Sequence, residues 1–239
     1  ARDLFAGSDG NFKMLYNVYN YDPVTFEGNE EYYIFTIDFA TGKTVDPKCL
    51  NDSFAKAGID PMNAYLNNMA MLSDGNYYFS TGDGFVYVVD GNMNFVKKIT
   101  LGDGYTSRMI AFGDSLLVSM YDTNYTNESY YIIENGQVTP FTNTNSLGDY
   151  VYDILAVDDG KLYFRKEMGV WYFDIATGEC EEELNFLNSD IDYTNMNSVI
   201  YLESGKMLMT ATNWDEGSNG QTVMSLLTKV PDEEIKEEI

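Results

Sequence analysis

The sequence contains no histidine among its 239 residues, and this absence excludes several catalytic designs. Ser-His-Asp and Cys-His machinery, imidazole bases and His-ligated zinc all need an imidazole ring. There are only two cysteines, Cys49 and Cys180, and they lack the spacing of a metal site, so we expect two free thiols. The sequence therefore predicts no metal ligand and no cofactor, and it assigns no catalytic residue.

Basic residues are also scarce. Lys and Arg together number 14 against 38 Asp and Glu, which gives a formal charge of −24. Because contacts between basic side chains and phosphates dominate nucleic-acid affinity, a nucleic-acid partner is not expected. An anionic membrane surface is disfavoured for the same reason. Long apolar runs are missing too, since none approaches the roughly 18 residues that span a bilayer, and no membrane insertion is predicted.

Apolar residues make up 44% of the sequence and aromatic residues 15%, which supplies ample material for a core. Disorder is therefore not expected despite the high net charge. All-β chains of this length are commonly one unit.

The chain repeats itself. Residues 73–101 and 158–184 share one order: an acidic turn, an aromatic strand, a short connector, a second aromatic strand, a tight turn and a third strand. Turns of this kind recur at intervals of 40 to 45 residues, with one longer interval that holds an insertion, and such a period is typical of propeller blades. The aligned turns are Asp9-Gly10, Asp74-Gly75, Asp114-Ser115, Asp159-Gly160 and Ser204-Gly205.

The strands of these repeats are apolar along much of their length, which indicates sheets that are covered on both faces. Radially stacked four-stranded blades satisfy this requirement. The predicted fold class is all-β, a β-propeller of about five four-stranded blades that either forms a ring by itself or is part of a larger propeller. A β-sandwich, which also uses many short strands, is the alternative.

The predicted propeller domain covers residues 1–230, and the acidic, proline-containing stretch 231–239 is interpreted as a tail or linker. A helical insertion is expected near residues 48–62. The fifth repeat shows no fourth strand in the sequence. The repeats are placed at about 1–48, 63–101, 105–141, 149–186 and 194–230.

The segments "SDGNYYFSTGDGFVYVVDGNMNFVKKI" and "DDGKLYFRKEMGVWYFDIATGECEEEL" resemble blades of bacterial extracellular β-propellers of the NHL, YVTN and quinoprotein-like group. The composition and the stretch "KVPDEEIKEEI" are similar to propeller regions that precede a solute-binding domain in secreted bacterial lipoproteins. The resemblance implies an extracellular or cell-surface location. It carries over no functional residue, because the WD dipeptides and quinone-site motifs of related propellers are missing.

The candidate binding residues lie in long connections. In a propeller, connections between second and third strands share one face with connections between blades, and the long segments of this sequence all fall in those two classes. Long loops on a rigid scaffold commonly carry binding residues. Aromatic rings beside amides and carboxylates suit carbohydrates and peptides, although they also cover loops and cap turns. The loop candidates are Tyr21, Tyr121, Asp122, Tyr125, Trp214 and Asp215.

Two further candidates, Arg108 and Asp153, are aligned in the first strands of their repeats. Arg108 is suited to a carboxylate or a phosphorylated group, and its structural alternative is a salt bridge to Asp153. A column of tyrosines at the strand starts, including Tyr105, is expected either to line a channel rim or to pack between blades. Asp3 and Asp153 form the only candidate acid and base pair for a glycosidase, and no Glu shares their column.

Two sharper motifs are interpreted structurally. "DGNMN" at residues 90–94 lacks the closing Glu of a calcium loop and is expected to be a turn. "TGDGF" at residues 81–85 lacks the phosphate-loop lysine and is expected to be a connector. The predicted function is a non-catalytic extracellular propeller that binds a small carbohydrate or peptide. The alternatives are an interaction propeller that packs on another domain of a larger parent chain, and a five-bladed glycoside hydrolase.

Overall fold

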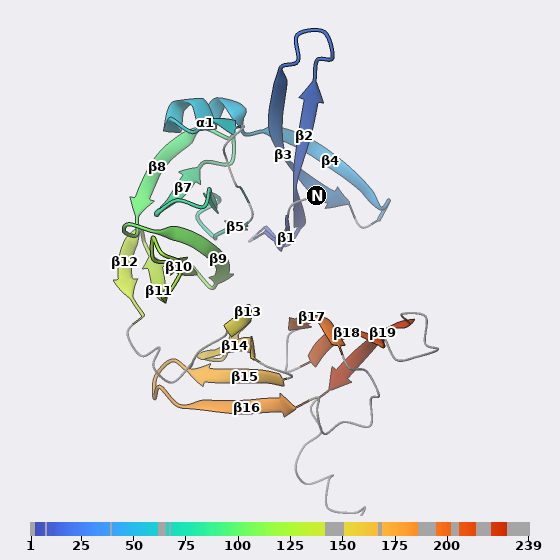
Figure 1. The fold of residues 1–239 in the computed structure, drawn as a ribbon, viewed down its shortest axis with the longest axis vertical. Helices are drawn as coiled ribbons and strands as arrows, with labels where there is room; N and C mark the ends of the chain where they lie inside the picture. Colours follow the sequence, from blue (N-terminus) through green and yellow to red (C-terminus); the bar gives the residue numbers. More distant parts are fainter. Residues whose placement is uncertain are drawn as a thin grey trace, which may run out of the picture. The chain divides into compact units, whose positions relative to one another are not determined.

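The computed structural model describes residues 3–7, 9–38, 40–61, 66, 68–141, 151–166, 169–185, 195–201, 206–213 and 221–228. The chain divides into two compact units, residues 1–142 and residues 143–239. Strands of five separate antiparallel sheets account for most of both units (Figure 1).

The first unit holds three sheets, each a meander of four strands in sequence order. The first sheet contains β1 (Asp3–Ala6), β2 (Phe12–Tyr21), β3 (Gly28–Asp38) and β4 (Lys43–Cys49). The second contains β5 (Met69–Met71), β6 (Tyr77–Ser80), β7 (Phe85–Val89) and β8 (Phe95–Thr100). The third contains β9 (Tyr105–Phe112), β10 (Ser115–Tyr121), β11 (Glu128–Glu134) and β12 (Gln137–Pro140).

The second unit holds two sheets with the same order. One contains β13 (Val151–Asp158), β14 (Lys161–Lys166), β15 (Gly169–Asp174) and β16 (Cys180–Asn185). The other contains β17 (Asn195–Tyr201), β18 (Lys206–Asn213) and β19 (Gln221–Thr228). Within each unit the first strands of successive sheets are neighbours, since β5 contacts β1 and β9, and β13 contacts β17. This repeated strand order confirms the predicted fold class, an all-β propeller with five blade sheets.

One of the aligned turns was placed wrongly by one residue. Phe112 pairs with Ser115, so the β9–β10 turn is Gly113-Asp114 and Ser115 already belongs to a strand. A β-bulge in β13, between Ile154 and Ala156, offsets the difference, so Arg108 and Asp153 each pair with the fifth residue of the following strand, Ser119 and Arg165. Bulges shift register without changing the alignment of the surrounding blade, and a sequence alignment does not reveal them.

The insertion forms the helix α1 (Asn51–Ala57), as the sequence predicts. It ends at Gly58, whose φ of 76° is the left-handed conformation that glycine adopts without steric cost. Phe54 is fully buried, and its ring lies 5.4 Å from the rings of both Tyr32 and Phe79. The helix therefore fills the core between the first and second sheets of its unit.

The second sheet explains why the strands are apolar at every position. Tyr87 and Val89 belong to the core cluster shared with the first sheet, and Val86 and Val88 belong to the cluster shared with the third. All four side chains are at most 4% exposed. Because both faces of this sheet are covered, its strands do not alternate apolar with polar residues. This agrees with the prediction of sheets covered on both faces.

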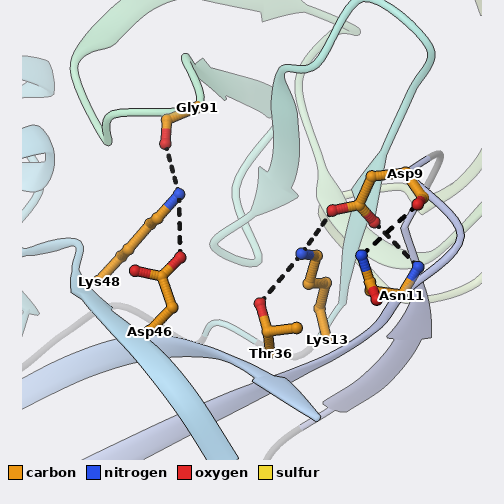
Figure 2. A network of polar contacts seen from close by, with 7 residues as sticks. All are labelled: Asp9, Asn11, Lys13, Thr36, Asp46, Lys48 and Gly91. Atoms are coloured by element: carbon orange, nitrogen blue, oxygen red, sulfur yellow. Dashed lines mark hydrogen bonds and ion pairs between the residues drawn. The ribbon is translucent and has the colours of Figure 1, made fainter. Parts of the chain in front are cut away.

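One hydrogen bond ties the first sheet to the turn after β7, and other polar contacts join residues within the first sheet (Figure 2). The Lys48 amine donates a hydrogen bond to the Gly91 carbonyl at 2.8 Å and lies 3.5 Å from the Asp46 carboxylate. The Lys13 amine, only 5% exposed, donates to Asp9 at 2.7 Å and to the Thr36 hydroxyl at 3.1 Å. A buried lysine needs such partners, because desolvation of an unpaired ammonium is costly.

Candidate functional site

Two of the predicted long loops lie among the described residues, and they are shorter than expected. Pairing of Tyr21 with Gly28 extends β2 and β3 to a loop of residues 22–27, and pairing of Tyr121 with Glu128 leaves a loop of residues 122–127. The predicted connections, residues 20–30 and 122–129, included strand residues at their ends. Hydrogen bonding across the strands extended the hairpins into polar sequence.

The two loops share a design that the sequence analysis did not find. Each begins with an aspartate whose backbone N–H donates to the carbonyl of the last loop residue, Glu27 in one loop and Asn127 in the other. Each also holds an exposed aromatic residue with a left-handed backbone: Phe26 with φ 60° and Tyr125 with φ 57°. Bulky residues rarely adopt this conformation, and strain of this kind gathers at functional sites.

Asp122 fixes the second loop. Its carboxylate accepts the backbone N–H of Asn124 and Thr126, the Thr126 hydroxyl at 2.7 Å and the Asn127 amide at 2.8 Å. The Thr126 amide, followed by the Thr126 hydroxyl and the Asn127 amide, holds the pKa of Asp122 well below its ordinary value. The carboxylate is therefore engaged in holding the loop.

Three tyrosines gather around this loop. The Tyr105 and Tyr125 rings are stacked, with centroids 4.5 Å apart and planes 8° from parallel, and the Tyr121 ring lies 6.3 Å from Tyr125. Tyr125 is 63% exposed and Tyr105 is 37% exposed. Partial desolvation, followed by the neighbouring Tyr105, raises the pKa of Tyr125. We call Tyr105, Tyr121 and Tyr125 the tyrosine platform.

The structure thus brings together Tyr121, Asp122 and Tyr125 as predicted neighbours, and it adds Tyr105, which was considered only as a rim or packing residue. The sequence feature that points to Tyr105 is its position at the start of β9, the strand that pairs with β10. Register pairs Tyr105 with Tyr121, and proximity to the loop completes the stack.

Arg108 lies deeper on the same sheet. It is half-buried on β9 and pairs with Ser119, which in turn pairs with Tyr130. The Tyr130 hydroxyl donates to Glu128 at 3.0 Å, and burial, followed by the Glu128 charge, raises the pKa of Tyr130. Arg108 is close enough to Tyr130 to oppose that shift. Its proposed roles, ligand contact or a salt bridge to Asp153, stay predictions.

Tyr21 does not join the tyrosine platform. It lies at the outer end of β2, is 52% exposed and lines an open hollow at the hairpin tip with Asn20, Asp22 and Thr25. The remaining candidates lie beyond what the structure describes: Trp214 and Asp215 fall outside the described residues, and so does the side chain of Asp153. The backbone register of Asp153, opposite Arg165, matches that of Arg108, opposite Ser119, which keeps the predicted column.

The two rejected motifs are structural. Residues 90–94 form the β7–β8 turn, in which the Asp90 carboxylate accepts the amides of Asn92 and Asn94. Residues 81–84 connect β6 to β7. Within the described ranges no group of three or more His, Cys, Asp or Glu side chains is placed to hold a metal, and both Cys49 and Cys180 are free thiols. No described helix is long and apolar enough to span a membrane.

Hydrogen-bonded aspartates in the turns make the stability of the fold depend on pH. Hydrogen bonds from turn amides and hydroxyls lower the pKa of several of them, Asp122 most clearly, below the ordinary value of 3.8. A depressed pKa contributes stability that is present above 3.8 and lost as the pH falls toward the folded value. The aspartates concerned are Asp22, Asp38, Asp90, Asp122 and Asp174.

For Asp122→Asn we therefore expect a stability deficit relative to wild type that is full above pH 3.8 and shrinks below it. Chemical unfolding of both proteins from neutral to strongly acid pH measures the difference. Relief of repulsion in so acidic a chain affects both proteins alike and largely cancels. A deficit that stays constant across the acid range would show that the carboxylate charge does not hold the loop.

Comparison with known proteins supports the fold. No protein-family model matches the chain, and no curated protein matches it. TolB from Acinetobacter baumannii matches 91% of this chain and 53% of its own length, with a TM-score of 0.54 and 15% identity. At this identity the likeness shows the fold alone, a β-propeller.

Two other solved structures are similar at lower TM-scores. The extracellular domain of a proposed hybrid two component system from B. thetaiotaomicron matches 87% of this chain and 27% of its own, at 14% identity and a TM-score of 0.47. Regucalcin, a calcium-binding protein from Agrobacterium tumefaciens, matches 86% and 72%, at 13% identity and a TM-score of 0.47. This chain spans about half the length of TolB and about a quarter of the B. thetaiotaomicron structure.

Proposed function

We propose that this protein is a non-catalytic, ligand-binding β-propeller whose long loops bind a small carbohydrate or a peptide. The observation that carries the proposal is the tyrosine platform. Its exposed Tyr125 ring is presented by a residue with a left-handed backbone, in the loop that Asp122 holds by hydrogen bonds. The extracellular or cell-surface location rests on the resemblance of the repeats to bacterial extracellular propellers.

The platform has the chemistry of such a site. Aromatic faces pack against the C–H faces of sugars and against peptide side chains, and hydroxyls and amides satisfy polar groups. Tyr125 offers an exposed face and a neutral hydroxyl, and the exposed Asn124 adds an amide beside it. The rigid loop reduces the entropy lost on binding, because the ring is already positioned before the ligand arrives.

Removal of the Tyr121 or the Tyr125 ring is expected to weaken binding without unfolding the protein. With the strongest saccharide or peptide ligand of a screening panel, Tyr125→Ala and Tyr121→Ala should each raise Kd by about tenfold, in the range of an interface aromatic residue. Trp214→Ala is expected to act in the same direction. Isothermal titration measures the affinities, and thermal melts check that the variants remain folded.

Tyr125→Phe is the matched control, because it keeps the ring and removes only the hydroxyl. Its Kd should change by less than that of Tyr125→Ala if ring contact dominates. Unchanged affinity in both Tyr121→Ala and Tyr125→Ala would refute this location for the site.

A further inference from the structure

The hairpin of β2 and β3 projects from the first sheet well beyond β1, β4 and α1 (Figure 1). We call its residues 16–33 the arm. Its strands are longer than those of the other described sheets, and its tip carries Val24 and Phe26 at 82% and 76% exposure. None of residues 16–31 is buried, so this part of the arm contributes little to the core of its own sheet.

One face of the arm continues the core face outward. Leu15 and Tyr32, on the same face, are at most 1% exposed, and α1 covers them. The Asn51 side chain marks where that cover ends, because it accepts the Tyr32 N–H and donates to the Glu30 carbonyl. Beyond this point the same face presents Tyr19 and Tyr21, which are 56% and 52% exposed.

The two tyrosine rings form a regular surface. Their centroids are 6.5 Å apart, and their planes are 17° from parallel. Gly28 makes the arrangement possible, because a Cβ at that position would lie 2.2 Å from the Tyr19 hydroxyl oxygen. The spacing matches the roughly 6.6–6.8 Å between alternate residues of an extended chain.

The charge of the arm has one sign. Residues 16–33 contain four acidic side chains, Asp22, Glu27, Glu30 and Glu31, and no Lys or Arg. Glu30 pairs directly with Tyr19 across the hairpin, so both side chains lie on the same face, and the Glu30 carboxylate accepts a hydrogen bond from the Asn17 amide. A second copy of this chain, with a net charge of −24, would be repelled by this surface, whereas a basic partner would be attracted.

We propose that the arm binds an extended segment of a partner protein that carries arginine at alternate positions. Each guanidinium would stack on one tyrosine face, and the acidic charge of the arm would attract both, since arginine combines planar stacking with donation to carboxylates. The exposed tip residues would contact apolar side chains of the same partner. This interaction is separate from ligand binding at the tyrosine platform and does not depend on it.

Fluorescence anisotropy tests the proposal with a labelled peptide of about twelve residues in which arginine alternates with glycine, at about 150 mM salt. Tyr19→Leu with Tyr21→Leu removes both rings, and we expect Kd to rise about tenfold, from about threefold per ring. Tyr19→Phe with Tyr21→Phe keeps both rings and should bind nearly as wild type. The same peptide with lysine in place of arginine should bind more weakly.

A charge-matched pair separates the arm from the net charge of the chain. Glu27→Gln with Glu30→Gln should raise Kd by about two- to fivefold more than the control, Glu134→Gln with Glu179→Gln, which removes two exposed carboxylates elsewhere. If both pairs changed Kd equally and the leucine variant did not change it, the peptide would be bound only by the net charge of the chain. This result would overturn the proposal. Sedimentation that shows wild-type dimers dissolved by the leucine variant would also overturn it, because the occupant would then be a second copy.

Discussion

Phe54→Ala is expected to lower the free energy of unfolding by about 3–5 kcal/mol, the cost of deleting a large buried aromatic side chain. Phe54 is fully buried in α1, and its ring contacts Tyr32 of the first sheet and Phe79 of the second. Removal opens a cavity between two sheets that share one core. Since natural domains are stable by only about 5–15 kcal/mol, this single change should remove a large fraction of the total.

Chemical unfolding measures the loss, and Phe26→Ala is the matched control. Phe26 is 76% exposed on the arm, so its removal should change stability by no more than about 0.5 kcal/mol. If Phe54→Ala lowered the free energy of unfolding by less than about 1 kcal/mol, the insertion helix would not be part of the core.

Gly84→Ala is expected to destabilise the protein by about 3 kcal/mol or more, the upper range for overpacking, because the added Cβ has no room. It would lie 1.8 Å from the Gly102 carbonyl oxygen, which belongs to backbone and cannot rotate away. At this crossing the connection from β8 to β9 passes over the β6–β7 loop, and the Leu101 N–H donates to the Gly84 carbonyl at 2.9 Å.

Gly91→Ala is the control for this change. A Cβ at Gly91 would meet only the Gly75 carbonyl oxygen, at an ordinary contact distance of 3.6 Å, so stability should change little. Thermal or chemical unfolding compares the two variants. Equal stability of both would show that the crossing is looser than the structure indicates. Because the displaced segment leads directly into Tyr105, Gly84→Ala should also disturb the tyrosine platform.

The repeated order of strands and turns could be predicted from the sequence because local residues determine it. Acidic-Gly and Thr-Gly turns mark hairpins through the backbone freedom of glycine, as at Gly42 and Gly178, both with positive φ. Continuous apolar strands such as Phe85–Val89 reveal cover on both faces. The helix within the insertion, expected near residues 48–62, is α1.

The candidate site was only partly predictable, because its geometry depends on register and backbone conformation. The sequence pointed to Tyr121 and Tyr125, but the stack with Tyr105 requires that the start of β9 reach the loop after β10. Tyr125 has a left-handed backbone, and no sequence pattern predicts this conformation for an aromatic residue. Similarly, residues 20–30 of the arm were predicted as a connection because they are polar, whereas the pairing of Asn20 with Asn29 continues the hairpin through them.

A thermal-shift panel of oligosaccharides, peptides and calcium, run on wild type and Tyr125→Ala side by side, tests the proposed binding function most directly. A ligand that binds only the folded state at about 100 times its Kd adds about 2.7 kcal/mol, which corresponds to a rise in Tm of about 5–10 °C for a chain of this size. We predict such a rise for a saccharide or a peptide in the wild type, and a clearly smaller rise in Tyr125→Ala. A clean cooperative melt that no ligand shifts, or an equal shift in both proteins, would contradict a ligand-binding tyrosine platform.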